Sequence, residues 1–146
     1  MRMLHDPATR SSLEARLKAL RPDAPRQWGS MTSDQMLWHM NQFLTFSIEG
    51  GAQERKRSAL VAAMFRFVLL HMPWPKSAPT NPKARAQGSH DFNAERERCL
   101  ALIDKFVSRP IDAPWPEDPS FGEMTGVFAS RLQAKHLDHH LRQFSA

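Results

Sequence analysis

Apolar residues recur at helical spacing in five stretches of this chain, and proline or glycine marks the joins between them. No segment shows the alternation of apolar and polar residues that is typical of a half-buried strand. Four of the expected helices begin with capping residues, at Asp6, Thr32, Asp91 or Asn93, and Thr125, and the third helix begins at about Ser58. The pattern predicts an all-α fold: a four-helix bundle with an additional short helical segment and two proline-rich loops, at 72–90 and 109–124.

Length and composition indicate one domain that spans residues 1–146. A chain of 146 residues, 41% of them hydrophobic, is large enough to bury its own core. Cys99 is the only cysteine, which excludes an intrachain disulfide and a cysteine zinc motif. It falls on an apolar stripe, so we interpret it as a core residue.

The sequence also carries no signal for secretion or membrane insertion. Residues 1–7 lack the apolar stretch of a signal peptide. The longest apolar-rich run, 60–72, is interrupted by Arg66 and is too short to span a bilayer. We therefore expect a cytoplasmic protein with no membrane partner.

The net charge of +5 comes from 20 lysines and arginines that are scattered along the chain. The only tight group is Glu54-Arg55-Lys56-Arg57. Scattered basic charge is typical of a solvated surface rather than of a nucleic-acid interface. Nucleic acid is therefore not an expected partner.

The third helical stretch, about 58–71, is apolar on nearly all sides. A helix of this kind is either fully buried or shared with a partner subunit. The second alternative predicts a homodimer that forms through residues 60–70.

Histidines cluster in the last helix, where His136 and His140 are separated by one turn. Side chains at this spacing lie on the same face, and the helical wheel places both in the middle of the apolar arc. His139 lies at the edge of the arc, and we expect it to be exposed. Lys135 and Asp138 fall in the opposite sector of the wheel, which we expect to face solvent. His39 faces inward in the second helix and could supply a third ligand. Buried imidazoles are costly unless they are hydrogen-bonded or coordinated.

A structural explanation for the same histidines remains open. Histidines in the last turns of a helix interact favourably with its dipole, and a pair with this spacing occurs by chance in many helices. The spacing alone therefore leaves a metal site and a set of structural histidines as alternatives.

Five segments of the chain form a recognisable set. They are Trp28-Gly29-Ser30-Met31-Thr32 with Gln35, Met36 and His39; Pro79-Thr80-Asn81-Pro82-Lys83; Asp91-Phe92-Asn93-Ala94-Glu95-Arg96; Phe121-Gly122-Glu123-Met124-Thr125; and Lys135-His136-Leu137-Asp138-His139-His140-Leu141-Arg142-Gln143-Phe144. Together these segments resemble a known protein family, the DUF1569 family, which belongs to the DinB-like superfamily of metal-binding four-helix bundles. The resemblance covers nearly the whole chain. One departure stands out, because relatives tend to carry a tryptophan near the position of Phe128.

The resemblance implies that His39, His136 and His140 hold a divalent metal ion with open positions for water or a thiolate. Three imidazoles suit Zn²⁺ or Ni²⁺. The chemistry it implies is that of a thiol-dependent S-transferase or a hydrolase, with a small-molecule substrate and, for the transferase, a low-molecular-weight thiol. Asp138 and Glu123 are the nearest acidic residues, but neither is assigned as a general base. The alternative is a non-catalytic helical bundle that acts as a dimeric binding or interaction module.

Overall fold

The computed structural model describes residues 2–51, 56–76, 78, 82–118 and 120–146. Within these ranges the chain forms five α-helices and no β-strand, so the predicted all-α fold is confirmed. Glu54 and Arg55 of the basic group, and Pro79 and Pro119 of the predicted loops, lie outside the described residues. The elements are α1 (Pro7–Ala19), α2 (Ser33–Glu49), α3 (Ala59–His71), the short 3₁₀ helix η1 (Pro82–Ala84), α4 (Phe92–Ser108) and α5 (Gly126–Gln143).

Side-chain caps begin the helices where the sequence predicts them. The Asp6 carboxylate accepts a hydrogen bond from the Thr9 amide at the start of α1. At the start of α2, the Gln35 side chain accepts one from the Thr32 amide. Ser58, Asp91 and Thr125 cap α3, α4 and α5 in the same manner. Each cap satisfies an amide that has no partner within its own helix.

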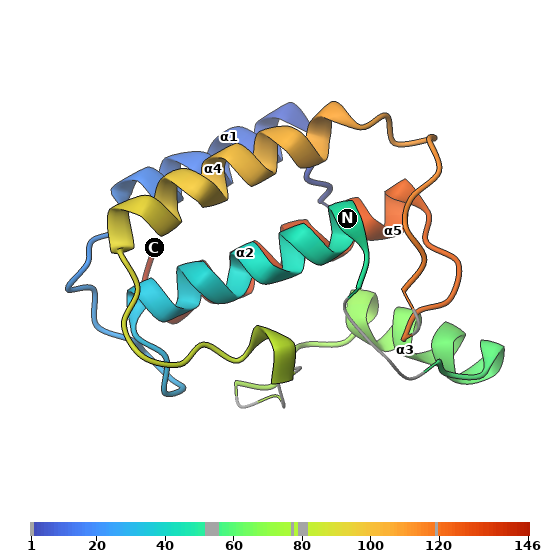
Figure 1. Ribbon diagram of the computed structural model, residues 1–146, viewed down its shortest axis with the longest axis horizontal. Helices are drawn as coiled ribbons and strands as arrows, with labels where there is room; N and C mark the ends of the chain where they lie inside the picture. Colours follow the sequence, from blue (N-terminus) through green and yellow to red (C-terminus); the bar gives the residue numbers. More distant parts are fainter. Residues whose placement is uncertain (1, 52–55, 77, 79–81, 119) are drawn as a thin grey trace.

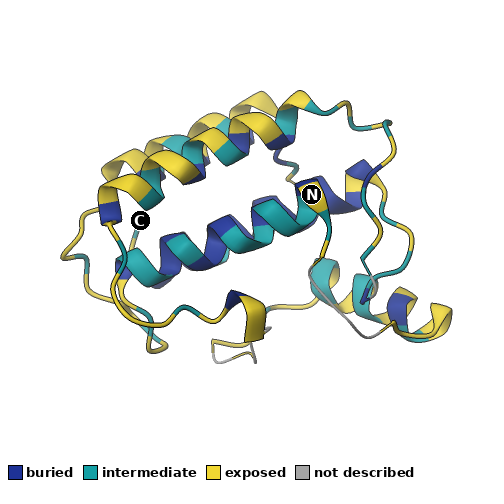
Figure 2. Ribbon diagram, viewed as in Figure 1, coloured by how far each residue is buried: buried dark blue, intermediate teal, exposed yellow. Residues whose placement is uncertain are grey.

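Four of the helices form a closed ring, which is the predicted bundle (Figure 1). α2 packs chiefly against α4 and also against α5, and α1 completes the ring by contacting α4 and α5. The inward faces supply a continuous apolar core, coloured dark blue in Figure 2. Leu17, Leu37, Ile103 and Leu137, one from each helix, are fully buried there.

α5 is enclosed on more sides than the sequence predicted, because α1, α2 and α3 all pack against it. The helical wheel placed Lys135 and Asp138 on a solvated face, and that prediction is wrong. The Lys135 Nζ donates hydrogen bonds to the carbonyls of the last turn of α3, at 2.7 Å for Leu69. Asp138 accepts one from Arg16 of α1 at 2.7 Å. Polar residues on this face therefore bind the neighbouring helices.

α3 lies outside the ring, beside α5 (Figure 1). Ala62 is its one buried residue, whereas the side chains of Leu60 and Phe67 are 81% and 61% exposed. Of the two alternatives for this apolar helix, full burial is therefore wrong. Figure 2 shows the exposed residues of this helix in yellow.

The two loops pack against different parts of the bundle. In the 72–90 connection, Trp74 lies against α5 and the Ala84 carbonyl reaches α2. In the 109–124 connection, Trp115 is buried against Phe106 of α4. None of the helices in the described ranges has the length and apolar character needed to cross a membrane.

The start of α5 fits closely against the second loop, and this contact can be tested by Gly126→Ala. A Cβ at residue 126 would overlap the Ile111 carbonyl and the Trp115 indole nitrogen. Helix propensity alone favours alanine by up to about 1 kcal/mol, but the overlap costs about 1–3 kcal/mol. We expect a lower free energy of unfolding in urea denaturation. A variant at least as stable as the wild type would contradict this packing.

Candidate metal centre

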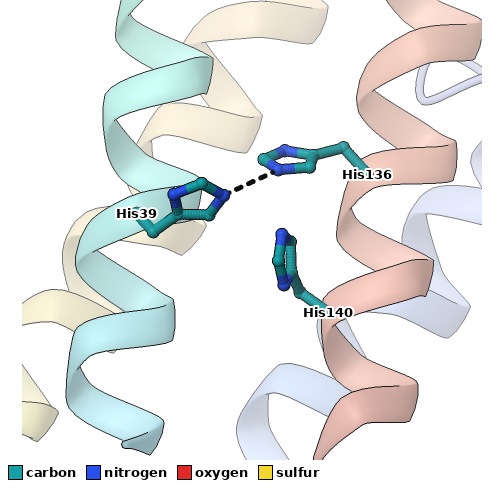
Figure 3. Close-up of side chains that lie close together, drawn as sticks. All are labelled: His39, His136 and His140. Carbon is teal, nitrogen blue, oxygen red and sulfur yellow. Dashed lines mark hydrogen bonds between the residues drawn. The ribbon is translucent and has the colours of Figure 1, made fainter. Parts of the chain in front are cut away.

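The structure brings His39 of α2 together with His136 and His140 of α5 (Figure 3). One ring nitrogen from each of the three residues lies within 4.8 Å of the other two. The side chains are 3%, 6% and 8% exposed, so the cluster is buried. All three predicted ligands therefore meet at one point in the bundle.

The antiparallel packing of α2 on α5 sets this meeting point. The Gln133 amide donates to the Phe43 carbonyl at 3.3 Å and to the Ser47 hydroxyl at 2.6 Å. Gln133 lies about one turn before His136 on α5, and its partners lie about one and two turns after His39 on α2, so the bonds fix the register between the two helices. The i, i+4 spacing on α5 then stacks His136 and His140 opposite His39.

Hydrogen bonds to Nδ1 determine the tautomers of His39 and His140. The His39 Nδ1 lies 2.8 Å from the Ala84 carbonyl oxygen, and the His140 Nδ1 lies 3.0 Å from the Gln143 Oε1. Both oxygens can only accept, so each Nδ1 carries the proton. The Nε2 lone pairs of both rings are therefore free to bind a metal ion.

His136 differs from the other two histidines. Its Nε2 lies 3.2 Å from the His39 Nε2, and its Nδ1 is buried without a hydrogen-bond partner among the described residues. Because the His39 Nε2 has no proton, the His136 Nε2 donates in this pair. A metal ion bound at the His136 Nε2 requires the proton to reside on Nδ1 instead.

The donor set fits a divalent transition metal. Zn–N distances of about 2.0–2.1 Å with tetrahedral angles place two ligand nitrogens about 3.3 Å apart. The observed separation of 3.2 Å between the His39 and His136 Nε2 atoms matches this spacing. Metal-binding histidines usually donate their other N–H to an oxygen acceptor, as His39 and His140 do here. The residues present are therefore those that a three-histidine site needs.

Burial keeps the imidazoles neutral. Desolvation lowers the pKa of His39 and lowers that of His136 further, and neighbouring histidines add to the shift in His136. The pKa of His140 is lowered to about 3 by the same burial, with a smaller contribution from His39. At neutral pH the three rings are therefore in the form that binds metal ions.

Aromatic side chains enclose the cluster. The Phe43 ring centroid lies 4.7 Å from that of His136 and 5.0 Å from that of His39. On another side, Trp74 lies 5.8 Å from His136. His139 is half-buried and packs against Trp74 at 5.5 Å, so the expectation of an exposed His139 is wrong.

Sequence reasoning missed three contributors to the site. Gln143 follows His140 by three residues, a spacing that places both on one helical face and that could have identified it. Trp74 and the Ala84 carbonyl come from the loop before α4, and no local pattern connects them to the histidines. Phe128, the departure from the family pattern, lies two turns from His136. It lines a separate cavity of about 400 Å³ beside Phe67.

Comparison with known proteins gives a family but no characterised relative. The sequence profile of the family described as "Protein of unknown function (DUF1569)" matches residues 5–146. No curated protein and no solved structure matches the chain.

The lowered histidine pKa values predict acid sensitivity of the metal-free protein. Unfolded imidazoles titrate at about pH 6.5, so below that pH the unfolded chain binds more protons than the folded one. The contribution of these imidazoles to the free energy of unfolding is therefore fully present above about pH 7. It falls as the pH decreases, by up to about 1.4 kcal/mol per pH unit for each imidazole. Urea denaturation near neutral pH and at about pH 5.5 measures this slope.

The variant His140→Gln removes one of the titrating groups and should reduce that slope. Replacement of the exposed His71 by glutamine provides a matched control outside the cluster. Equal slopes for the wild type and His140→Gln would contradict the predicted coupling.

Proposed function

The chain belongs to the DUF1569 family, and on that premise we propose that it is a metal-dependent enzyme with a His39, His136 and His140 site. The metal is a divalent ion, Zn²⁺ or Ni²⁺, and the substrate is a small molecule. The reaction is thiol-dependent S-transfer or hydrolysis. The observation that supports this proposal is the convergence of three buried, neutral imidazoles on one point.

Three neutral ligands leave the full positive charge of a divalent ion uncompensated and leave coordination positions open. A divalent ion held by these residues would supply Lewis acidity, which would lower the pKa of a bound water molecule or thiol toward neutral pH. Phe43 and Trp74 contribute by limiting access of bulk water to the histidines.

No general base is assigned to the site. Asp138 pairs with Arg16 at 2.7 Å and with Arg142 at 3.0 Å, so its carboxylate is already neutralised. Among the described residues, the three histidines are the only potential metal ligands that lie close together as a group of three or more. This favours S-transfer, in which a low-molecular-weight thiol acts as its own nucleophile once it is deprotonated.

The first test is metal content, measured by mass spectrometry on protein freed of any histidine tag. We expect near-stoichiometric divalent metal in the wild type and its loss in His136→Ala, because removing one of three ligands leaves an incomplete site. His71→Ala, at an exposed histidine of α3, is the matched control and should retain the metal. If the wild type bound no Zn²⁺ or Ni²⁺ even when these were added, the proposed site would be abandoned.

The metal-loaded protein then distinguishes the two reactions. Loss of a small thiol in the presence of an electrophile would identify an S-transferase, whereas cleavage of an ester or amide without any thiol would identify a hydrolase. Either activity should disappear in His136→Ala and persist in His71→Ala. A metal-loaded protein that lacks both activities would favour a non-catalytic binding module.

A second proposal concerns association, and it is supported by the exposure of α3. α3 lies outside the ring of four helices, and its residues Leu60, Met64 and Phe67 are each more than half exposed. Exposed apolar patches of this kind mark interaction surfaces more often than random surface. We infer that α3 packs against a second copy of the chain, as the sequence predicted.

Sedimentation velocity tests this association. Phe67→Glu places a charge on the exposed face and should shift the protein from dimer to monomer, because burying an unpaired charge in an interface is costly. Val127→Glu, at an exposed apolar residue of α5, is the matched control and should leave the dimer intact. A wild type that sediments as a monomer at all concentrations would overturn the proposal.

A further inference from the structure

We propose that Gln143 is a positioning residue for the metal ligand His140, and that the Trp28-Gly29 loop holds Gln143 in place. The inference rests on the proposed metal site and extends it to residues outside the ligand set. It also gives the Trp28-Gly29 segment a role, which is to hold the Gln143 amide.

Gln143 is buried, at 3% exposed, and both polar atoms of its side chain have a partner. Its Oε1 accepts from the His140 Nδ1 at 3.0 Å, and its Nε2 donates to the Trp28 carbonyl at 2.8 Å. Its own backbone carbonyl accepts from the Gln27 amide at 2.7 Å. The bond to Trp28 fixes which end of the amide is oxygen, so the end that faces His140 must be the acceptor.

Gly29 makes this arrangement possible. Its backbone has a φ of +78°, which is strained for any residue with a side chain. A Cβ at this position would also overlap the Gln143 Nε2. The loop can therefore approach the Gln143 amide only because residue 29 is glycine.

The three histidines differ in how their Nδ1 atoms are held. His39 uses the backbone carbonyl of Ala84, and His136 has no partner among the described residues. Only His140 depends on another side chain. Without the Gln143 oxygen, the His140 ring would lose the interaction that keeps the proton on Nδ1 and the lone pair on Nε2. The free energy of metal binding would then be less favourable, because binding would also have to orient that ring.

The experiment compares metal-free variants titrated with Zn²⁺ and, separately, with Co²⁺, whose visible absorption reports coordination geometry. Gln143→Leu should weaken Zn²⁺ binding by about 10- to 100-fold and alter the Co²⁺ spectrum. Gln143→Glu keeps an acceptor for the His140 Nδ1 but loses the bond to Trp28, so it should recover only part of the affinity and of the Co²⁺ spectrum that Gln143→Leu loses. A purely structural residue would change the melting temperature of the metal-free protein without this pattern of rescue.

Gly29→Ala tests the loop without altering Gln143 or any ligand. It should weaken Zn²⁺ binding in the same direction as Gln143→Leu, because the new methyl group displaces the amide. Gly51→Ala is the matched control: its φ of +89° imposes the same backbone strain, but a Cβ there meets no atom within 4 Å. Its Zn²⁺ affinity should equal that of the wild type.

The outcomes separate this inference from the proposed function. If the wild type bound metal and Gln143→Leu retained its affinity and Co²⁺ spectrum, Gln143 would have no positioning role and the metal site would stand. If the wild type bound neither metal, the proposed site itself would fail. Equal weakening by Gly29→Ala and Gly51→Ala would overturn the role of the loop contact.

Discussion

The need to satisfy three buried imidazoles governs how this bundle is assembled around its site. Each ring has two nitrogen atoms, and little water reaches them. Two of the Nδ1 atoms have acceptors: a loop carbonyl for His39, and Gln143 in the last turn of α5 for His140. The Nε2 atoms are left to face one another (Figure 3). In the metal-free cluster the His136 Nε2 donates to the His39 Nε2, and this leaves the His136 Nδ1 buried without a partner among the described residues. A cation bound at the Nε2 atoms would instead use the lone pair of each ring.

The α-helical architecture and the inward direction of the three histidines were predictable from sequence because both depend on local periodicity. Caps such as Asp6 and Thr125 mark helix starts, and the i, i+4 spacing of His136 and His140 fixes their common face. The role of the Ala84 carbonyl as the acceptor for His39 was not predictable, because the type of a residue does not indicate which side chain its backbone carbonyl will contact. Trp74 likewise reaches the histidines only through the path of a loop.

The polar face of α5 shows a second limit of sequence reasoning. A helical wheel separates apolar from charged residues, but it does not distinguish a charge in water from one that binds a neighbouring helix. Lys135 caps the carbonyls at the end of α3, where the negative end of that helix favours a cation. This contact attaches α3 to the bundle and brings Trp74, which follows α3 directly, over His136. A residue expected on the surface thereby helps to build one wall of the site.

The chemistry follows from the ligand set rather than from the fold, because the same bundle can support unrelated activities. A site with a carboxylate ligand would neutralise part of the metal charge and could also provide a base. In the proposed site the three ligands are neutral, and Asp138, which lies between His136 and His140 in sequence, pairs with Arg16 and Arg142. The charge of a bound ion would then be available to an anionic fourth ligand, and among the described residues no carboxylate joins the three histidines to take a proton. A thiolate would meet both conditions, because it carries a negative charge and has already lost its proton.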